Sequence, residues 1–496
     1  MKRMKLRYLV ALILLTNCSG DDEEQKPPPD QVSANFTVSH TTIKVGESVT
    51  YTDLSDRNVN EWKWSFEGGV PNSSTEQNPV VRYDSPGSFN VSLTVFNGNL
   101  EDTEVKENYI TITIEVVETP TGSFEAGDET TFGLSATLDR MQSMITLDDG
   151  SFVCVGWTDN NKPQKSILNI LVAKFDSNLE LIWDKLIEGS AQDVVREIIP
   201  TNDGGFLLSA TTRSKDGDIP ENKGESDITI IKLTENGDIE WVKTYGGSGY
   251  DGVNTRSLIK REEGYAFIGH TSSEDAGIPG KVGNRDIWLV EIDDNGNTGS
   301  SFALGSADDD YAYALVKSGA GYVVLSEIGA IADDFDKPGL WLFEVNSDGQ
   351  IGWKTFINGQ YPGEVIKTQD GGYLSLNAKA SGTPDLLVTK FDNQGRVQWE
   401  KLYPLPEEEF AQSVIEIEDG YIILGRSEST SATRPVSPYV AKINQVGEIV
   451  QSETFGNGNA VATRILKAGD QKFILGGGQA VGPNAEFWLQ IVTDTK

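Results

Sequence analysis

A ten-residue stretch beginning at Asp203, DGGFLLSATT, has four relatives elsewhere in the chain. They begin at Asp148, Glu262, Asp370 and Glu418, and each places a short acidic turn containing Gly before an apolar run. Turn residues followed by apolar, aromatic and β-branched residues predict a tight turn that leads into a strand. The repetition constrains the fold strongly, because every copy has to build the same element.

An aromatic residue opens the apolar run of every copy, and aligning these aromatics reveals two further copies. Successive aromatics are 48 to 59 residues apart, and each interval holds several strand-like segments; the aromatics are Phe152, Phe206, Tyr265, Tyr322, Tyr373, Tyr421 and Phe473. A period near fifty with several strands per period is typical of a β-propeller, in which four-stranded blades surround a channel.

One unit shows the four strands of a blade, A to D. Strand A is VREIIP, strand B is FLLSATT, strand C is DITIIKLT and strand D is IEWVKTY, with an Asn-Gly turn between C and D. Asn-Gly suits the positive φ angles of a tight hairpin. The Trp of strand D recurs as Trp183, Trp241, Trp353 and Trp399. This element resembles quinoprotein propellers, in which such tryptophans dock neighbouring blades.

The two ends of the repeat region are complementary. The seventh unit stops after strand C, while residues 121–126 precede the first strand A and have no other partner. We therefore expect the N-terminal segment to supply strand D of the last blade. The prediction is a seven-bladed propeller over residues 118–496, closed by its N- and C-terminal segments; six or eight blades are the alternatives, because some units are degenerate.

Residues 32–117 alternate apolar and polar side chains in short runs separated by turn residues, which predicts a small β-sandwich and makes the whole chain all-β. Trp64-Ser65-Phe66, Gly68-Gly69 and Pro86-Gly87 carry a resemblance to the PKD domain, an immunoglobulin-like module of microbial surface proteins. The resemblance implies a spacer or a weak binding module, and no catalysis.

The N-terminus has the features of a targeting signal. MKRMKLR is basic, and the apolar run YLVALILL is too short to span a membrane as a helix. The run ends just before Cys18, and the segment resembles a bacterial lipoprotein signal, which implies that residues 1–17 are removed and Cys18 is acylated. SGDDEE resembles the acidic tag that sends lipoproteins of Bacteroidota to the cell exterior. The alternative is an ordinary secretory signal with a chance Cys.

Residues 18–31 are charged and Pro-rich, and they predict an extended tether. The lipid is then the only membrane attachment, and the localisation is the outer membrane, facing outward. Over its whole length the chain resembles lipoproteins of Bacteroidota that join a PKD domain to a propeller, a resemblance that implies no activity.

Charge and histidine content exclude some functions. The net charge of −34 disfavours binding to nucleic acid, which is itself a polyanion. His40 and His270 are the two histidines, far apart in the sequence, so a His-rich zinc site is not expected.

Loop lengths distinguish the two faces of the predicted ring. The B–C connections are long, whereas the A–B and C–D turns are short. In a propeller the B–C and D–A connections share one face, here called the long-loop face, and the other is the short-turn face. Binding sites tend to form on long connections. We expect the sandwich to attach at the rim of the short-turn face, so that the long-loop face points away from the membrane.

Two residue sets on the long-loop face are candidate binding residues. An acid recurs where each D–A loop meets strand A, at Asp139, Asp193, Asp251, Asp310 and Glu409. These acids predict a ring of carboxylates for a cation, with calcium as the candidate cofactor, or for a polar ligand; the alternative is that each caps its own loop. The aromatics are Trp157, Tyr250, Tyr311, Tyr361 and Phe410, which either contact a sugar or protein ligand or pack between blades.

These features favour a non-catalytic, surface-exposed lipoprotein that binds a glycan or a protein through its long-loop face. The alternative is a propeller-fold carbohydrate-active enzyme, a lyase or a glycosidase, that uses carboxylates on that face. A third reading is a scaffold subunit of an envelope complex, whose ligand is then another protein.

Overall fold

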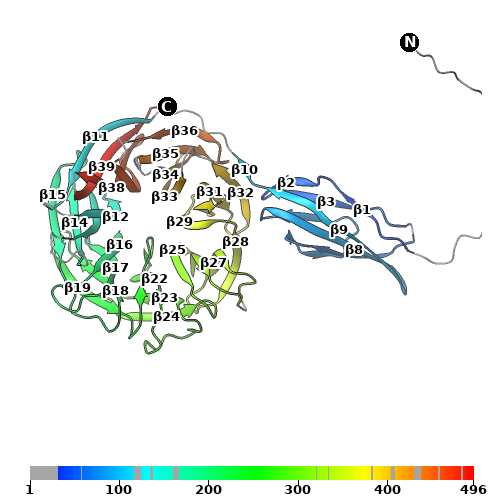
Figure 1. The fold of residues 1–496 in the computed structure, drawn as a ribbon, viewed down its shortest axis with the longest axis horizontal. Helices are drawn as coiled ribbons and strands as arrows, with labels where there is room; N and C mark the ends of the chain where they lie inside the picture. Colours follow the sequence, from blue (N-terminus) through cyan, green and yellow to red (C-terminus); the bar gives the residue numbers. More distant parts are fainter. Residues whose placement is uncertain are drawn as a thin grey trace, which may run out of the picture.

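The computed structural model describes residues 32–116, apart from residue 57, and residues 124–495, apart from 135–137, 160–166, 320, 333, 381–383, 404–407, 429–436, 456–458 and 482–483. The predicted signal peptide, Cys18 and the tether lie outside the described residues. The described residues form strands, bridges and turns and contain no helix, and they divide into a sandwich and a ring (Figure 1).

The sandwich consists of two sheets. One has the order β1 (Phe36–Val38), β3 (Ser48–Asp53), β7 (Val80–Tyr83), β5 (Gly69–Val70). The other has the order β2 (Thr42–Lys44), β9 (Leu100–Thr113), β8 (Gly87–Asn97), β4 (Glu61–Phe66), β6 (Ser73–Ser74). Buried and exposed positions alternate along β3 and β4, so one face of each strand contributes to a shared core.

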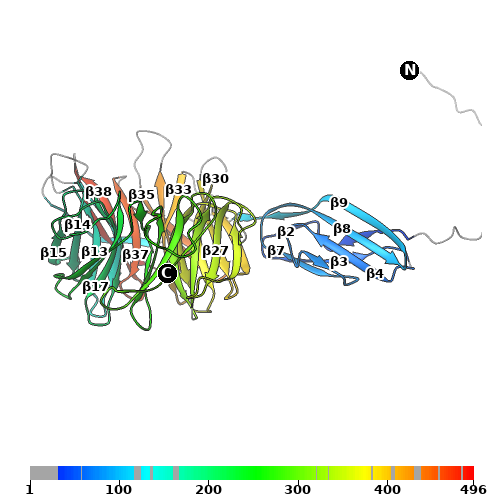
Figure 2. The ribbon, with the colours of Figure 1, turned by 90° about the horizontal axis from the view of Figure 1, so that it is seen from below.

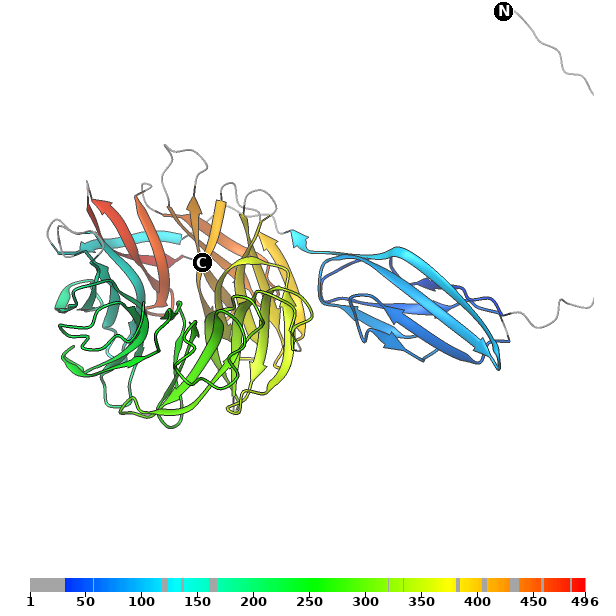
Figure 3. The same cartoon turned by 60° about the horizontal axis from the view of Figure 1, so that its bottom comes forward.

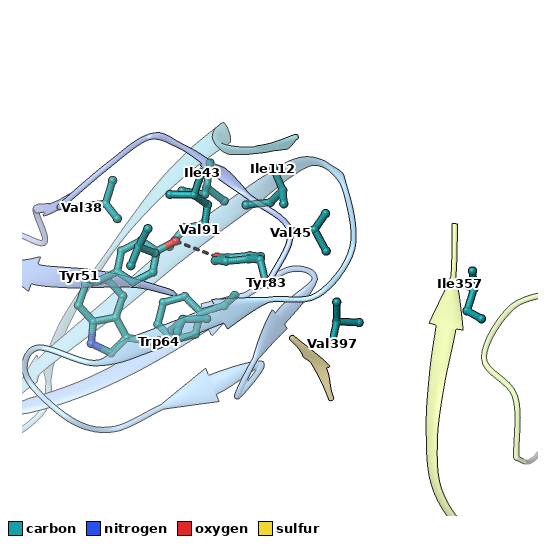
Figure 4. Packing of buried hydrophobic residues seen from close by; sticks show 14 of the residues in the cluster. Val38, Ile43, Val45, Tyr51, Trp64, Tyr83, Val91, Ile112, Ile357 and Val397 are labelled. Carbon is teal, nitrogen blue, oxygen red and sulfur yellow. Dashed lines mark hydrogen bonds between the residues drawn. The ribbon is translucent and has the colours of Figure 1, made fainter. Parts of the chain in front are cut away.

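Aromatic side chains fill that core. Trp64 is 1% exposed and stacks on Phe66, with ring centroids 5.6 Å apart. The buried hydroxyls of Tyr51 and Tyr83 are 2.8 Å apart and satisfy each other by a hydrogen bond (Figure 4). Trp64 is therefore a core residue of the sandwich.

The ring consists of seven four-stranded antiparallel sheets with strand A innermost (Figure 1). In blade order from 1 to 7, strand A is β12 (Asp139–Thr146), β16 (Asp193–Pro200), β20 (Asp251–Gly252) with β21 (Leu258–Lys260), β25 (Tyr311–Ser318), β29 (Gln360–Lys367), β33 (Glu408–Ile417) and β37 (Ala460–Lys467). Strand B is β13 (Phe152–Thr158), β17 (Phe206–Thr212), β22 (Tyr265–Thr271), β26 (Gly321–Ile328), β30 (Tyr373–Ala380), β34 (Gly420–Glu428) and β38 (Lys472–Val481). These strands B begin at or next to the recurring aromatics, so the repeat unit in the sequence is one blade.

The outer two strands complete each blade. Strand C is β14 (Asn169–Phe175), β18 (Asp227–Leu233), β23 (Asp286–Ile292), β27 (Gly339–Val345), β31 (Pro384–Phe391), β35 (Ser437–Asn444) and β39 (Asn484–Asp494). Strand D is β15 (Leu181–Ile187), β19 (Ile239–Tyr245), β24 (Thr298–Leu304), β28 (Ile351–Ile357), β32 (Val397–Tyr403), β36 (Ile449–Thr454) and β11 (Phe124–Phe132).

The N-terminal segment closes the ring, as predicted. Strand β11 pairs antiparallel with β39, from Phe124 opposite Asp494 to Phe132 opposite Phe487. The last blade therefore takes three strands from the C-terminus and one from the N-terminus, and the chain forms seven blades.

Strand D aromatics join neighbouring blades. A Cβ added to the C–D turn glycine of one blade would contact the strand D aromatic of the preceding blade, in the pairs Gly237–Trp183, Gly296–Trp241, Gly349–Phe302, Gly395–Trp353 and Gly447–Trp399. Each of these glycines has a positive φ, between 72° and 80°. Two constraints therefore require glycine at these positions. The turn needs a positive φ, and the aromatic side chain of the preceding blade leaves no room for a Cβ.

The sandwich meets the side of the ring (Figures 2 and 3), and the contact is at the outer strand of blade 5 (Figure 1). Strand β10 (Glu115–Val116) adds to β32 in parallel, and the Glu115 carboxylate lies 2.8 Å from Lys44 Nζ and 3.3 Å from Lys401 Nζ. Val397 of blade 5 joins the core of the sandwich (Figure 4). The junction is on the flank of the ring, at the outer strand of blade 5 and close to its C–D turn, which is the short-turn side on which the sequence predicted the attachment.

The contact between a turn glycine and its neighbouring aromatic can be tested in blade 5. Gly395→Ala forces an alanine into positive φ, costing about 1–2 kcal/mol, and drives its Cβ into the Trp353 ring, costing about 1–3 kcal/mol more. Gly371→Ala is the matched control, because Gly371 has a φ of 86° in the same blade and nothing within 4 Å of an added Cβ. We expect Gly395→Ala to lower the thermal unfolding midpoint clearly more than Gly371→Ala, and equal shifts would contradict the docking contact.

Candidate functional site

The recurring acids start strand A at the long-loop face, and those whose side chains are described are buried. Asp139, Asp193, Asp251 and Asp310 are each 0% exposed. Glu409 lies within β33, but its side chain and that of Phe410 lie outside the described residues. The four buried carboxylates cannot face bulk water in the channel mouth.

Hydrogen bonds account for the positions of these carboxylates. Asp193 accepts from the hydroxyls of Thr212 (2.6 Å) and Ser214 (2.8 Å), both from the end of strand B in the same blade and the loop after it. Asp251 accepts from the Gly247 backbone N–H (2.9 Å) and the Ser273 hydroxyl (2.6 Å).

The other two acids follow the same scheme. Asp310 accepts from the backbone N–H groups of Ser306 (2.6 Å) and Gly329 (2.8 Å), and Asp139 accepts from the Leu134 N–H (2.9 Å). This is the loop-capping arrangement, the alternative to a cation site.

The same acids also hold adjacent blades together. The backbone N–H groups of Asp193, Asp251 and Asp310 each donate, at 2.8 Å, to a carbonyl just before strand C of the preceding blade; the acceptors are Leu168, Ser226 and Arg285. The glycine that ends the preceding strand D lies between this acid and the first residue of strand C, so that an added Cβ on Gly246 would collide with both Asp227 and Asp251. We call this arrangement the blade clasp.

The clasp brings like charges together between blades 2 and 3. Burial, with Asp251 as a further contribution, raises the pKa of Asp227 to about 6. Blade 1 has Asn169 at the equivalent position in strand C, where its Oδ1 accepts from the Gly189 N–H at 3.3 Å. Blade 1 therefore shows that a neutral amide can take the place of the carboxylate at this position.

The sequence contained a signal for the clasp. A Thr follows the acid by 19 or 20 residues in blades 1 to 3, as Thr158, Thr212 and Thr271, and each pairs with its acid in the A–B register. An acid and a Thr in a fixed register on adjacent strands indicate a structural hydrogen bond.

Two of the five predicted aromatic residues pack around the same histidine. Tyr250 stacks on His270 with ring centroids 5.6 Å apart, and Tyr311 contacts the edge of the same His at 5.4 Å. The Arg285 guanidinium lies 5.1 Å from the Tyr250 ring and 5.0 Å from the Tyr311 ring. Burial, aided by nearby arginines, lowers the pKa of His270 to about 3, so this His is neutral.

Trp157 and Tyr361 lie apart from that cluster. The Arg140 guanidinium is 5.7 Å from the Trp157 ring. Tyr361 has a φ of 49° and a side chain that is 52% exposed. The structure therefore joins two of the predicted aromatics, Tyr250 and Tyr311, and leaves these two elsewhere on the face.

The centre of the channel holds a buried ion cluster that sequence reasoning missed. Arg256 Nη2 lies 2.5 Å from Glu364 Oε1, and Arg464 Nη2 lies 3.5 Å from Glu197 Oε2. The Arg256 backbone N–H also donates to Glu197 Oε2 (2.7 Å). Two arginines and two glutamates from blades 2, 3, 5 and 7 thus balance each other in charge, as buried ions require.

β-Bulges explain why the ion cluster was hidden in the sequence. Glu197, Glu364 and Arg464 each follow a register shift in strand A. A bulge changes which residues of a strand share a face, so simple alternation misplaces every side chain beyond it.

Two hollows open on the long-loop face. One, of about 530 Å³, lies between blades 4 and 5 and is lined by Tyr313, Glu327, Phe356, Tyr361 and Lys379 among others. The other, of about 480 Å³, lies at the channel mouth between blades 6, 7 and 1, and its lining includes Arg140, Gln142, Gln412 and Gln479. Both have sizes typical of small-ligand sites.

The described residues contain neither a cluster of metal ligands nor a membrane-spanning helix. In the described ranges, no group of three or more His, Cys, Asp and Glu side chains is arranged to hold a metal ion. None of the described segments forms a helix long and apolar enough to cross a membrane.

Residues 33–107 match the PKD domain family. No curated protein matches the chain. Among solved structures, a protein of unknown function from Dyadobacter fermentans is 8% identical, with 75% of this chain and 99% of that chain covered and a TM-score of 0.44.

Two further solved structures come from Bacteroides. A quinonprotein alcohol dehydrogenase-like protein from Bacteroides thetaiotaomicron is 10% identical, with 84% and 94% covered and a TM-score of 0.34. A putative 6-phosphogluconolactonase from Bacteroides uniformis is 11% identical, with 80% and 97% covered and a TM-score of 0.39.

The acid pair in the clasp predicts a pH-dependent stability. A carboxyl pKa raised from about 3.9 in the unfolded chain to about 6 in the folded chain stabilises the fold at low pH, and this contribution is lost as pH rises through 6. Asp227→Asn does not titrate, so we expect it to be more stable than the parent chain at pH 8, by up to about 3 kcal/mol. The advantage should vanish near pH 4.

Asp294→Asn is the control for that comparison, because it removes the same charge from an exposed C–D turn. Thermal unfolding measured from pH 4 to 8 gives the result. A stability difference between Asp227→Asn and the parent chain that does not change with pH would contradict the raised pKa.

Proposed function

We propose that the chain is a lipid-anchored protein of the outer cell surface that binds a glycan or a protein through its long-loop face, without catalysis. The two hollows on that face are the observation that carries the proposal. The resemblance of the N-terminus to lipoprotein signals of Bacteroidota, and the match of residues 33–107 to a PKD domain, support the placement at the cell surface.

The hollow between blades 4 and 5 has the composition of a sugar-binding surface. Tyr361 is exposed at its edge, and Tyr313 and Phe356 contribute further ring surface. Aromatic rings offer a flat apolar surface, to which the two tyrosines add a hydroxyl, and this suits ligands that are partly apolar and partly hydroxylated. Lys379, Asn358 and Gln360 supply polar groups around the rings.

The carboxylates favour binding over hydrolysis. Most glycosidases need two carboxyl groups about 5 to 10 Å apart. Glu327 is the one acid among the described residues that line the hollow between blades 4 and 5, and its Oε2 accepts from the Tyr313 hydroxyl at 3.0 Å. The described lining of the other hollow contains no Asp or Glu.

Binding can be tested by affinity electrophoresis of the full chain through gels that contain plant cell-wall or mucin polysaccharides. We expect retardation by at least one polymer, and Tyr361→Ala should weaken it about tenfold, a loss of about 1.4 kcal/mol. Val446→Ala is the control, because Val446 is an apolar residue of similar exposure, 56%, in a C–D turn on the opposite face.

Two results would count against the proposed function. Equal weakening by Tyr361→Ala and Val446→Ala would mean that the long-loop face is not the binding surface. Depolymerisation of the polysaccharide by the purified chain would mean that the chain is an enzyme.

The lipid anchor has its own test. Cells that express the chain and are fed labelled palmitate should incorporate label into it, and Cys18→Ser should abolish the incorporation. Cys154→Ala should leave the incorporation intact, because Cys154 is fully buried and burial raises the pKa of its thiol. Label retained in Cys18→Ser would exclude Cys18 as the acylated residue.

A further inference from the structure

The hollow at the channel mouth differs in composition from the chain as a whole. The chain has a net charge of −34, yet the described lining of this hollow carries two arginines and no carboxylate. Arg140 comes from the start of strand A in blade 1, and Arg426 from the end of strand B in blade 6. Arg426 has a further interaction of its own, so the inference rests on Arg140, and an arginine in the lining of a hollow in an acidic protein points to an anionic ligand.

The clasp engages the acid that is next to Arg140 in the chain. Asp139, its neighbour in the chain, is turned into the loop and accepts from the Leu134 N–H. The Arg140 guanidinium instead lies against the Trp157 ring. In the described part of the chain no carboxylate lies within ion-pair distance of Arg140, and the residue is exposed. Its planar donors are therefore available to a carboxylate.

The ion cluster in the channel adds no unpaired acid next to the hollow. Thr463 lines the hollow, and the next residue, Arg464, belongs to the ion cluster. Glu197 and Glu364, the two acids of that cluster, are already paired with Arg464 and Arg256. These two glutamates therefore do not cancel the attraction of Arg140 for an anion.

The rest of the lining can hydrogen-bond the hydroxyls of a sugar. Its amides are Gln142, Gln412, Asn459 and Gln479. An amide both donates and accepts hydrogen bonds, as a sugar hydroxyl does. The combination of guanidinium and amide groups matches a ring that bears one carboxylate and several hydroxyls.

We propose that the hollow between blades 6, 7 and 1 binds hexuronate residues, so that the ligand of the long-loop face is an acidic polysaccharide. This inference rests on the proposed function, since it names the class of glycan recognised by the same face. Arg140 holds the carboxylate, and the amides hold the hydroxyls.

The test uses the full chain and affinity electrophoresis through polygalacturonate, alginate or hyaluronan, with dextran and galactan as neutral polymers. At least one hexuronate polymer should retard the chain, and Arg140→Gln should weaken that retardation at least tenfold. Lys467→Gln is the matched control, because it removes one positive charge from an exposed position at the opposite end of strand A in blade 7. It should leave the retardation unchanged. Far-ultraviolet circular dichroism and thermal unfolding check that both variants fold.

Each other outcome overturns the inference. If only neutral polymers retard the chain, and Tyr361→Ala abolishes that retardation, the long-loop face still binds a glycan. Hexuronate is then excluded as its ligand, while the proposed function stands. Equal effects of Arg140→Gln and Lys467→Gln would show that overall charge governs binding. Competition by polyglutamate as strong as that by the free polysaccharide would identify an acidic peptide as the ligand. No retardation by any hexuronate polymer would also contradict the inference.

Discussion

The blade clasp is the interaction on which the ring depends. A sheet of four strands has two exposed faces, and a propeller buries them only when consecutive blades are fixed at a constant angle. The Asp that opens strand A does this at the long-loop face, by capping its loop with its carboxylate while its backbone N–H bonds to the preceding blade. The glycine contact of the strand D aromatic does the same at the short-turn face. Each repeat therefore supplies the contacts that join neighbouring blades as well as the strands of one blade.

The clasp also determines what the mouth of the channel can offer a ligand. Because Asp139 points into its loop, its neighbour Arg140 is left exposed on the long-loop face. The channel below holds the cluster of two arginines and two glutamates, and the two hollows open beside it on the long-loop face. A protein with a strongly negative net charge can in this way present a cationic and polar surface at one place.

Much of the fold followed from periodicity. The recurring aromatics gave the number of blades, the incomplete last unit gave the closure through β11, and the strand D tryptophans gave the docking contacts. These features depend on local sequence and on spacing, both of which a single chain displays.

The candidate site was less predictable. The recurring acids looked like a ring of ligands because sequence shows where a residue lies along a strand and not which way its carboxylate turns. Glu197 and Glu364 escaped notice because bulges move them to the channel. The hollow between blades 6, 7 and 1 combines residues from both ends of the ring sequence, such as Arg140 and Gln479, and its existence depends on the closure itself.

The central claim is that the recurring carboxylates join blades and do not coordinate a cation. Thermal unfolding of the full chain in millimolar calcium, compared with equal magnesium, tests it most directly. A calcium site filled to 100 times its Kd would stabilise the fold by about 2.7 kcal/mol and raise the unfolding midpoint by several degrees. We predict the same midpoint in both salts, to within about 1 °C for a domain of this size. A calcium-specific rise of several degrees, lost when Asp251 is replaced by Asn, would contradict the account.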